Sequence, residues 1–356
     1  MFDPGLTPEQ EQRAADLHRD LVVIDMLTES SLPENLFQNM LAGGLTCGSF
    51  TIGTAGLKRF HDGILPHHEH WWSRQSTVED LSLMQGLLAD PGNDAIHITS
   101  AADIRRAKAE GKVGVLLNVQ NSICIGTDID HIDFFYHLGL RVIQLTYNLQ
   151  NFVASGCLED PKKMLSNFGI EAIGRMNERG MLVDTGHTGE GSILHAVAVS
   201  EKPIACSHAG LAALSSPDNP RVVSDKALRA IAEKGGVFGL TAIPGMLTGG
   251  LRCTLDDWVD HLQHAINTIG INGVGIGSDF IAGASLAQIA TSPDWKGKEV
   301  PTSLEVWPVC DGHEGFENHA KYGNVTRALV ARGYSDSDIA KLMGGNWLRL
   351  IEDTIG

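Results

Sequence analysis

A (β/α)8 barrel is the fold that this sequence predicts, and two observations lead to it. Eight short apolar runs, typical of parallel strands buried on both faces, occur between residues 21 and 280. They are LVVIDML (21–27), GLTCGSFTIG (44–53), KVGVLLNVQ (112–120), LRVIQLTYN (140–148), MLVDTGH (181–187), PIACSH (203–208), GVFGLTAI (236–243) and GVGIGSDF (273–280). Helical patterns lie between these runs, which is the element order of a (β/α)8 TIM barrel. The alternative, a doubly wound open sheet, is disfavoured because no glycine fingerprint follows the first run.

The helical patterns have recognisable ends. They include STVEDLSLMQGLLAD, IDHIDFFYHLG, IEAIGRMNERG, SDKALRAIAEKGG and TLDDWVDHLQHAINTIG, several of which close on glycine as a C-cap. Ser224 is the expected N-cap of the fourth pattern. Two extra C-terminal helices, in NVTRALVARG and SDSDIAKLMGGNWLRLIED, are expected on the outside of the barrel. No repeat or linker interrupts the chain, so residues 1–356 are expected to form a single barrel domain.

The composition is that of a soluble enzyme. With 356 residues, 43% of them hydrophobic and 20% charged, the chain can bury a large core and is not a disordered protein. Its net charge of −16 disfavours nucleic acid and anionic membranes as partners. Six scattered cysteines without a CxxC motif predict free thiols in a reducing compartment. Because the N-terminus is polar and no run is as long as a membrane span, we expect a cytoplasmic protein.

Polar side chains stand at the ends of the predicted strands, where (β/α)8 barrels carry their chemistry. They are Asp25 to Glu29, Gln120 and Asn121, Tyr147 and Asn148, His187, His208, and Asp279. Metal ligands and proton carriers are common among these residue types, which favours a barrel of the metal-dependent hydrolase type.

His187 and His208 lie 21 positions apart (208 − 187) at the ends of consecutive predicted strands. Neutral imidazole favours zinc, and ligands on adjacent strands of a rigid barrel are preorganised. A lone strand-end histidine is more often a core imidazole, but two of them together with Asp279 favour a metal or catalytic role. Asp279 ends an apolar, glycine-rich strand and is expected to act as a general base, with capping of the next segment as the alternative.

Four segments of the chain are distinctive in combination: GMLVDTGHTGEGS, KPIACSHAGLAALSSPDNPRVVSDKALRAIAEKGGVFGL, GVGIGSDF and NVTRALVARGYSDSDIAKLMGGNWLRL. In order and spacing they resemble the membrane (renal) dipeptidase family, peptidase family M19, from about residue 20 to the C-terminus. The resemblance implies a (β/α)8 barrel with two bridged zinc ions that hydrolyses dipeptides, often with a D-residue on the carboxyl side. It also suggests a homodimer.

The resemblance further implies roles for individual residues. His187 and His208 would hold one metal, and Asp279 would be the catalytic acid/base. Arg221, in NPRVV, would bind the substrate carboxylate, a task that suits a bidentate guanidinium, whereas a solvated loop charge is the alternative. Asn148 is expected to line the substrate site.

Three strand ends depart from the family's pattern. The family's first strand ends in DGHND, whose histidine and last aspartate bind the second metal, whereas DMLTE places Leu27 and Glu29 at those positions. Gln120 falls at the bridging glutamate, and because a neutral amide is a weak ligand we expect it to face the substrate. Tyr147 replaces the histidine of LTHN that steadies the oxyanion, and its phenol can still donate one hydrogen bond.

These departures predict at most one tightly bound zinc ion, because two dications in one site need anionic bridges to offset their repulsion. His187 and His208 would hold this ion, and Glu29, Asp279 and Gln120 Oε1 remain alternatives for the third ligand. The segment PHHEHWW (66–72) is a further possible source of ligands, from His67 to His70, and of a pocket wall, from Trp71 or Trp72. A solvated insertion is the other interpretation, since loop clusters seldom reach a barrel mouth with the precision of a ligand.

The leading hypothesis is a metal-dependent hydrolase that cleaves a dipeptide or dipeptide-like amide, with a small molecule bearing a carboxylate as its partner. Tyr147 would steady the oxyanion. One alternative keeps the barrel but redirects it to a non-peptide amidohydrolase or lyase reaction. Another is a catalytically dead protein that binds a small carboxylate through Arg221.

Overall fold

Eight parallel strands form a closed barrel in the computed structural model, which describes residues 2–28, 36–53, 72–216, 219–248, 253–280 and 314–356. The strands of the ring are β1 (Ile24–Asp25), β2 (Cys47–Thr51), β4 (Val113–Val119), β5 (Val142–Gln144), β6 (Leu182–Asp184), β7 (Ala205–Leu211), β9 (Val237–Leu240) and β10 (Val274–Ile276). Each strand pairs in parallel with the next one in this order, and β10 pairs with β1 to close the ring. Every predicted run overlaps one of these strands, so the predicted barrel is confirmed.

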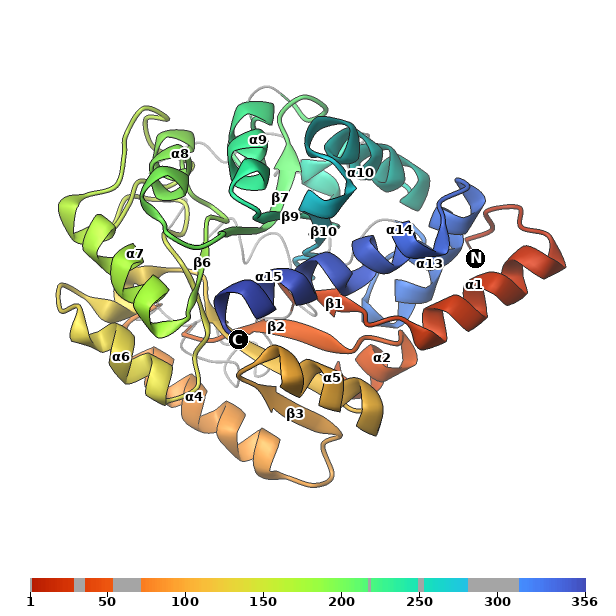
Figure 1. The fold of residues 1–356 in the computed structure, drawn as a ribbon, viewed down its shortest axis with the longest axis horizontal. Helices are drawn as coiled ribbons and strands as arrows, with labels where there is room; N and C mark the ends of the chain where they lie inside the picture. Colours follow the sequence, from red (N-terminus) through yellow and green to blue (C-terminus); the bar gives the residue numbers. More distant parts are fainter. Residues whose placement is uncertain (1, 29–35, 54–71, 217–218, 249–252, 281–313) are drawn as a thin grey trace.

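Helices surround the ring (Figure 1). They are α1 (Pro8–Asp20), α2 (Leu36–Ala42), α4 (Arg74–Ala89), α5 (Ala101–Glu110), α6 (Asp130–His137), α7 (Asn167–Arg179), α8 (Glu190–Val199), α9 (Asp225–Glu233), α10 (Leu255–Ile269), α13 (Tyr322–Ala331), α14 (Asp336–Ala340) and α15 (Asn346–Thr354). Ser224 caps α9 as predicted, because its side chain accepts the backbone N–H of Ala227. Among the helices that the structure describes, none has the length and apolar character needed to cross a membrane.

Two short strands lie outside the ring and are absent from the sequence prediction. β3 (Ala95–Ile98) pairs with the first half of β4, whose last residues pair with β5. β8 (Val222–Val223) pairs with the end of β7. The run AIHI has only four residues and includes an imidazole, so periodicity alone does not separate it from a loop. The ring closes without β3 because β2 pairs directly with β4.

Strand residues alternate between the inside of the barrel and the layer that packs on the helices. The inside is filled by side chains that include Ile24, Cys47, Leu116, Val142, Leu182, Ala205 and Val237. Trp347 of α15 joins this cluster, and its indole N–H donates to the Ile276 carbonyl oxygen at 3.0 Å. It approaches β10 closely because Gly275 has no side chain, since a Cβ there would lie 2.3 Å from Trp347 Nε1. The last helix, expected only on the outside, therefore also fills part of the barrel.

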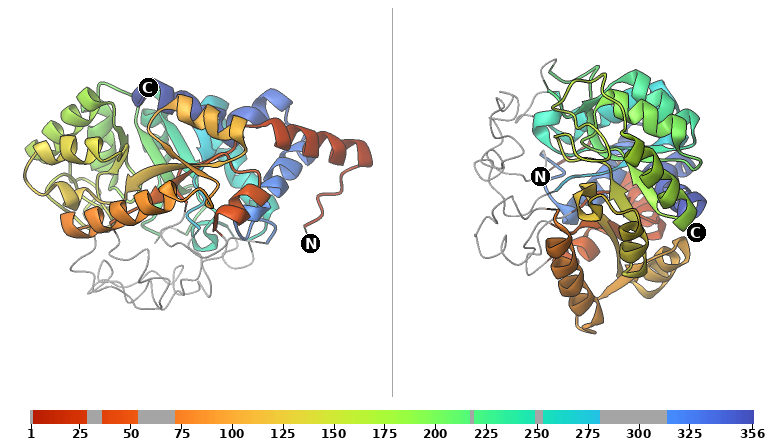
Figure 2. Two further views of the ribbon diagram at one scale, coloured as in Figure 1. Left: turned by 90° about the horizontal axis from the view of Figure 1, so that it is seen from below. Right: turned by 90° about the vertical axis from the view of Figure 1, so that its left-hand side faces the viewer.

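The two ends of the chain pack against each other. Helix α1 lies alongside α13 (Figures 1 and 2), and Arg327 of α13 donates to both carboxylate oxygens of Glu11 in α1. Arg105 of α5 forms an ion pair with Glu352 of α15. These contacts join the N-terminal and C-terminal helices to the same barrel.

Candidate active site

His187 follows β6 at the mouth of the barrel and is held as a neutral imidazole. Its Nδ1 lies 2.7 Å from Asn148 Oδ1, and its ring stacks on Tyr147 with the centroids 4.0 Å apart. Because an amide oxygen only accepts, the ring proton is on Nδ1 and the lone pair is on Nε2. Burial lowers the pKa of His187 well below its usual value, and the charges of Arg221 and His208 act in the same direction.

His208 lies in β7 and is fully buried. The Ser207 hydroxyl donates to Asp184 Oδ2 at 2.5 Å and lies 2.8 Å from His208 Nδ1. Since the single hydroxyl proton goes to the carboxylate, Nδ1–H donates to Ser207 Oγ and Nε2 is unprotonated. This Nε2 has no hydrogen-bond partner among the described residues and lies 3.9 Å from Asp279 Oδ2. Burial, and then the charge of Arg221, lower the pKa of His208 well below its usual value.

Asp279 follows β10, opposite the two imidazoles. Its backbone N–H donates to the Leu27 carbonyl oxygen at 2.9 Å. The preceding Ser278 donates its backbone N–H and its hydroxyl to the two oxygens of Asp25, at 2.9 and 2.5 Å. Burial raises the pKa of Asp279 to about 7, while the charge of Arg221 lowers it and that of Asp25 raises it.

The same support therefore occurs twice at the barrel mouth. Asp184 accepts the backbone N–H and the hydroxyl of Ser207, just as Asp25 accepts those of Ser278. Burial raises the pKa of both carboxyls, that of Asp25 to about 6. We refer to Asp184–Ser207 and Asp25–Ser278 as the carboxylate–serine clamps. Each one fixes the backbone directly before a residue of the site.

The backbone at the mouth is strained in a consistent way. Four non-glycine residues of the described chain have positive φ angles: Trp72 (60°), Asn148 (59°), His187 (55°) and Asp279 (60°). A left-handed backbone is uncommon outside glycine, and it persists where the surrounding structure enforces it, often at functional sites. All four residues belong to one neighbourhood, since Trp72 packs on Tyr147, with ring centroids 5.4 Å apart, next to Asn148.

Arg221 contributes a buried positive charge. Arg221 is only 3% exposed, and its Nη2 has no hydrogen-bond partner within the described part of the chain. The backbone is fixed by Asn219 Oδ1, which accepts the Arg221 N–H at 2.9 Å, and by Gly210 of β7, which donates to the Arg221 carbonyl at 3.2 Å. The alternative of a solvated loop charge is therefore wrong.

On the other side of the mouth, the residues that the structure describes after β1 and β4 and at the end of β5 are neutral, although β1 itself contains Asp25. Leu27 is fully buried after β1. Gln120, after β4, donates from Nε2 to Thr51 Oγ1 at 2.9 Å, and its buried Oε1 has no partner. Gln144 of β5 donates from Nε2 to the carbonyl oxygens of Gln120 and Thr146, at 2.5 and 2.7 Å. Its Oε1 is also buried without a partner.

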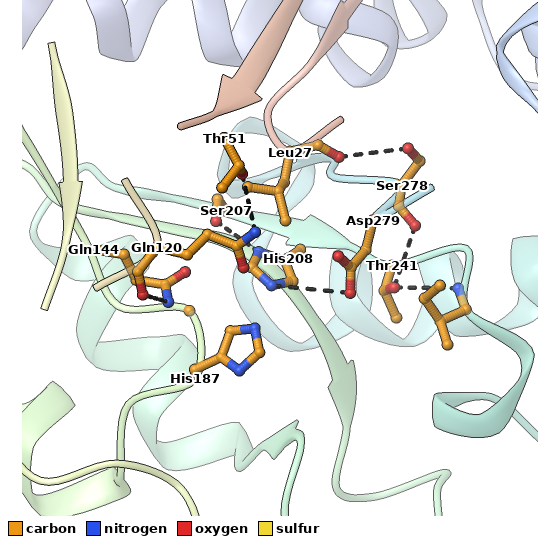
Figure 3. Close-up of polar contacts among 12 residues, drawn as sticks. Leu27, Thr51, Gln120, Gln144, His187, Ser207, His208, Thr241, Ser278 and Asp279 are labelled. Atoms are coloured by element: carbon orange, nitrogen blue, oxygen red, sulfur yellow. Dashed lines mark hydrogen bonds and ion pairs between the residues drawn. The ribbon is translucent and has the colours of Figure 1, made fainter. Parts of the chain in front are cut away.

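Figure 3 shows Gln120, Gln144, His187, His208 and Asp279 around one region of the mouth. Most of the predicted site residues thus come together, and Tyr147, Asn148 and Arg221 adjoin them. Glu29 and the His67–His70 segment lie outside the described residues.

The sequence prediction missed Gln144 and both clamps. A signal for the clamps is present in the sequence, because Asp25 and Asp184 interrupt apolar strands and a serine directly precedes both His208 and Asp279. Such buried carboxylates require hydrogen-bond donors nearby. Gln144 carries no comparable signal, since a glutamine inside a strand reveals neither its burial nor its partners.

The donor set fits one metal ion in part. His187 and His208 each have an unprotonated Nε2, and the Nε2 of His208 is a buried atom with no other partner. The Asp279 carboxylate, 3.9 Å from that nitrogen, is near enough for both to reach one ion at zinc–ligand distances of about 2 Å. Within the described ranges, no three His, Cys, Asp or Glu side chains converge as a complete site. These residues could therefore hold one ion with further ligands from elsewhere.

Comparison with known proteins identifies the family. The model of the membrane dipeptidase family, peptidase family M19, matches residues 13–292. The chain belongs to this family. An uncharacterised dipeptidase of Schizosaccharomyces pombe is 28% identical over 96% of this chain and 80% of its own length. Dipeptidase tcpJ of Claviceps purpurea is 27% identical over 88% of this chain, and the match spans 66% of that protein, just under two thirds.

Solved structures agree with this assignment. An amidohydrolase from Pseudomonas aeruginosa matches with a TM-score of 0.85 and 31% identity, over 96% of this chain and 98% of its own. A metallopeptidase from Rhodobacter sphaeroides, liganded with a phosphinate mimic of the dipeptide L-Ala-D-Ala, has a TM-score of 0.75 and 19% identity over 94% of this chain and 100% of its own. The latter likeness concerns the fold alone. As a member of a metallopeptidase family, the chain is a hydrolase of the dipeptidase type.

Proposed function

We propose that the protein hydrolyses a dipeptide or a dipeptide-like amide that ends in a free carboxylate, with one zinc ion held by His187 and His208. The observation that supports this most is the pair of unprotonated Nε2 atoms beside Asp279 at the barrel mouth. When bound there, the ion supplies activation of water and polarisation of the scissile carbonyl.

Each side chain of the site has a distinct task in this proposal. Asp279 takes the proton of the attacking water and passes it to the leaving amine. Tyr147 lies against His187, where its phenol can donate to the oxygen that becomes negative. Arg221 binds the substrate carboxylate through its buried, unpartnered Nη2, because a guanidinium in a dry site seeks an anion. Asn148 fixes His187 through the hydrogen bond to Nδ1 and would line the substrate site.

A second candidate keeps the same site but cleaves a non-peptide amide. It is favoured by Leu27 and Gln120, which replace a histidine and a glutamate of the family's pattern with an apolar and a neutral side chain. The P. aeruginosa relative with 31% identity is described as an amidohydrolase. Lyase chemistry and a binding protein without activity are further outcomes of the same test.

The test combines metal content with hydrolysis. The protein is purified without chelator and without a histidine tag, and metal per chain is measured by elemental analysis. It is then assayed against L-Ala-D-Ala, L-Ala-L-Ala and a panel of N-acyl amino acids. We expect about one zinc per chain and release of an amino acid from the dipeptides. Hydrolysis of N-acyl amides alone would favour the second candidate, and absence of both metal and turnover would contradict the proposal.

A further inference from the structure

The inside of the mouth contains an acceptor that has no hydrogen-bond partner among the residues that the structure describes. The nitrogen of the Gln144 carboxamide is identified by its partners, because both are backbone carbonyl oxygens, which only accept. Oε1 is therefore the other end of the group. It is buried, in a residue that is 1% exposed, and has no hydrogen-bond partner. A buried acceptor left alone costs roughly what a lost hydrogen bond contributes, so such atoms usually meet a ligand or an ordered water.

Gln120 provides a second acceptor next to the first. Its Nε2 donates to Thr51 Oγ1, and this hydroxyl lies 3.1 Å from Asn118 Oδ1, to which it donates. The carboxamide is thereby anchored at its nitrogen, and the buried Oε1 has no partner. Gln144 Nε2 also bonds the Gln120 carbonyl, so the two residues are joined directly. We call Gln120 Oε1 and Gln144 Oε1 the acceptor pair.

The acceptor pair borders the imidazoles. A Cβ placed on Gly186 would lie 2.6 Å from Gln144 Oε1 and 3.0 Å from His208 Cε1, so the oxygen and the edge of the imidazole meet at the space that Gly186 leaves open. Figure 3 shows both carboxamides on the side of the mouth that faces His187 and His208. A molecule positioned by these histidines would therefore present one of its groups to the acceptor pair.

The charges around the site indicate which group this is. Two carboxamide oxygens attract N–H donors, and they offer nothing to a carboxylate. Among the described residues of the site, Arg221 is the single buried cation. Its charge acts on His187, His208 and Asp279. It would bind the anionic end of the substrate. The site thus combines two unpartnered acceptors with a buried cation, which matches a small molecule with an amino group and a carboxylate.

We propose that Gln120 and Gln144 determine specificity by binding the free amino group of the substrate through their two Oε1 atoms. This inference rests on the proposed function and adds to it the residues that recognise the amine. The amide at position 120 then has a positive role: it accepts a substrate N–H where the family's pattern has a bridging carboxylate. No second ion is needed at this position.

The test is a pair of probes that cannot be hydrolysed. The zinc-loaded protein is titrated calorimetrically with the phosphinate mimic of L-Ala-D-Ala and with the same phosphinate lacking its amino group. The ratio of the two dissociation constants cancels everything that the probes share and reports on the amino group. Hydrogen bonds to a charged group predict a ratio of roughly 10 to 100 in favour of the amino probe.

The variants Gln144→Met and Gln120→Met should bring this ratio towards one while the probe without the amino group keeps its affinity. Gln12→Met, on the exposed face of α1, is the matched control and should keep the wild-type ratio. If a variant fails to fold, the ratio of dissociation constants measured for the wild type still tests the inference. A ratio near one in the wild type, no binding of the amino probe, or an unchanged ratio in both variants would overturn the inference.

Metal content and hydrolysis distinguish this inference from a role of Gln144 in metal binding and from the proposed function. Loss of zinc from Gln144→Met would assign Oε1 to the ion and also overturn the inference. If the wild type prefers the amino probe but hydrolyses no amide, the proposed function fails and the acceptor pair stands. If the wild type hydrolyses dipeptides but its probe ratio is near one, the proposed function stands and the role of the acceptor pair fails.

Discussion

The two sides of the barrel mouth differ in the kind of side chain that they offer. On the side of β6, β7 and β10, His187 follows β6, His208 lies in β7 and Asp279 follows β10. These side chains can bind an ion or carry a proton. On the side of β1, β4 and β5, the corresponding positions hold Leu27 and Gln120, neither of which carries a charge.

Their supports differ as well. A buried carboxylate–serine clamp stands directly before His208 and another before Asp279. On the neutral side the support is a chain of uncharged groups, in which Gln120 bonds Thr51 and Thr51 bonds Asn118. The clamp before His208 orients the imidazole through the Ser207 hydroxyl, whereas the uncharged chain orients a neutral carboxamide. This difference is the basis for proposing one ion on the first side and substrate recognition on the second.

The largest effect is expected from removing both imidazoles. In the double variant His187→Ala/His208→Ala, the ion should be lost and kcat/KM should fall by about 10³-fold or more, because activation of water disappears. Elemental analysis and dipeptide assays measure the two effects. His264→Ala, which removes a half-buried imidazole paired with Asp225 on the outside, is the control and should change neither. If the double variant retained the metal, the ion would not be held by the two histidines and the contrast between the two sides of the mouth would be wrong.

Asp279→Asn should separate the proton carrier from the ion. The amide keeps the size of the carboxylate but cannot accept the proton, so kcat should fall by about 10²- to 10⁴-fold. Zinc content should fall far less than in the double variant because both imidazoles are intact, although Asp279 lies within reach of the ion. A variant with normal kcat would show that another group moves the proton.

Converting the neutral side tests whether its residues exclude a second ion. The variant Leu27→His/Gln120→Glu supplies an imidazole and an anionic bridge, so metal content should rise from about one to about two equivalents per chain. Gln120→Glu alone is the control and should stay near one equivalent. If the wild-type protein already binds two equivalents of metal, the neutral side does not exclude a second ion and this prediction is wrong.

The two clamps can be compared directly. Ser207→Ala removes the partner of His208 Nδ1 and should weaken zinc affinity by about 10- to 100-fold, the usual cost of losing such a partner. Ser278→Ala removes the equivalent hydroxyl beside Asp279, which contacts no imidazole, and should leave zinc affinity nearly unchanged. Competition with a chromophoric chelator measures both affinities. Equal losses would mean that the clamps act only on stability.

The smallest effect concerns an imidazole that is buried away from the mouth. His261 of α10 accepts the Thr248 N–H on Nε2 at 2.9 Å, and burial lowers its pKa to about 4. The unfolded chain takes up a proton near pH 6.5 and the folded protein does not, so stability falls as the pH drops from 6.5 towards 4. Between pH 7 and pH 5 this histidine should reduce the free energy of unfolding by about 2 kcal/mol.

Urea unfolding of the wild type and of His261→Gln at both pH values isolates this contribution, because the other histidines are common to the two proteins. The pH-dependent loss should be smaller in the variant, and zinc affinity should not change. Equal slopes would show that His261 titrates normally in the folded state.

The barrel can be predicted from the amino-acid sequence alone. Parallel strands buried on both faces must be apolar throughout, so all eight runs are visible in the chain, and strand ends that share one rim bring His187, His208 and Asp279 together. The residues that depart from the family's pattern, Leu27 and Gln120, are likewise visible without coordinates.

The tertiary structure decided what the remaining polar groups do. Which imidazole nitrogen carries the proton depends on Asn148 for His187. For His208 it depends on Asp184, which takes the hydroxyl proton of the neighbouring Ser207. The role of Gln144 also depends on packing. Its Nε2 donates to the carbonyl oxygen of Gln120 on the neighbouring strand, whereas its Oε1 has no partner among the described residues. Hydrophobic burial follows the local pattern of a sequence, whereas hydrogen-bond partners in a site come from segments far apart in the chain.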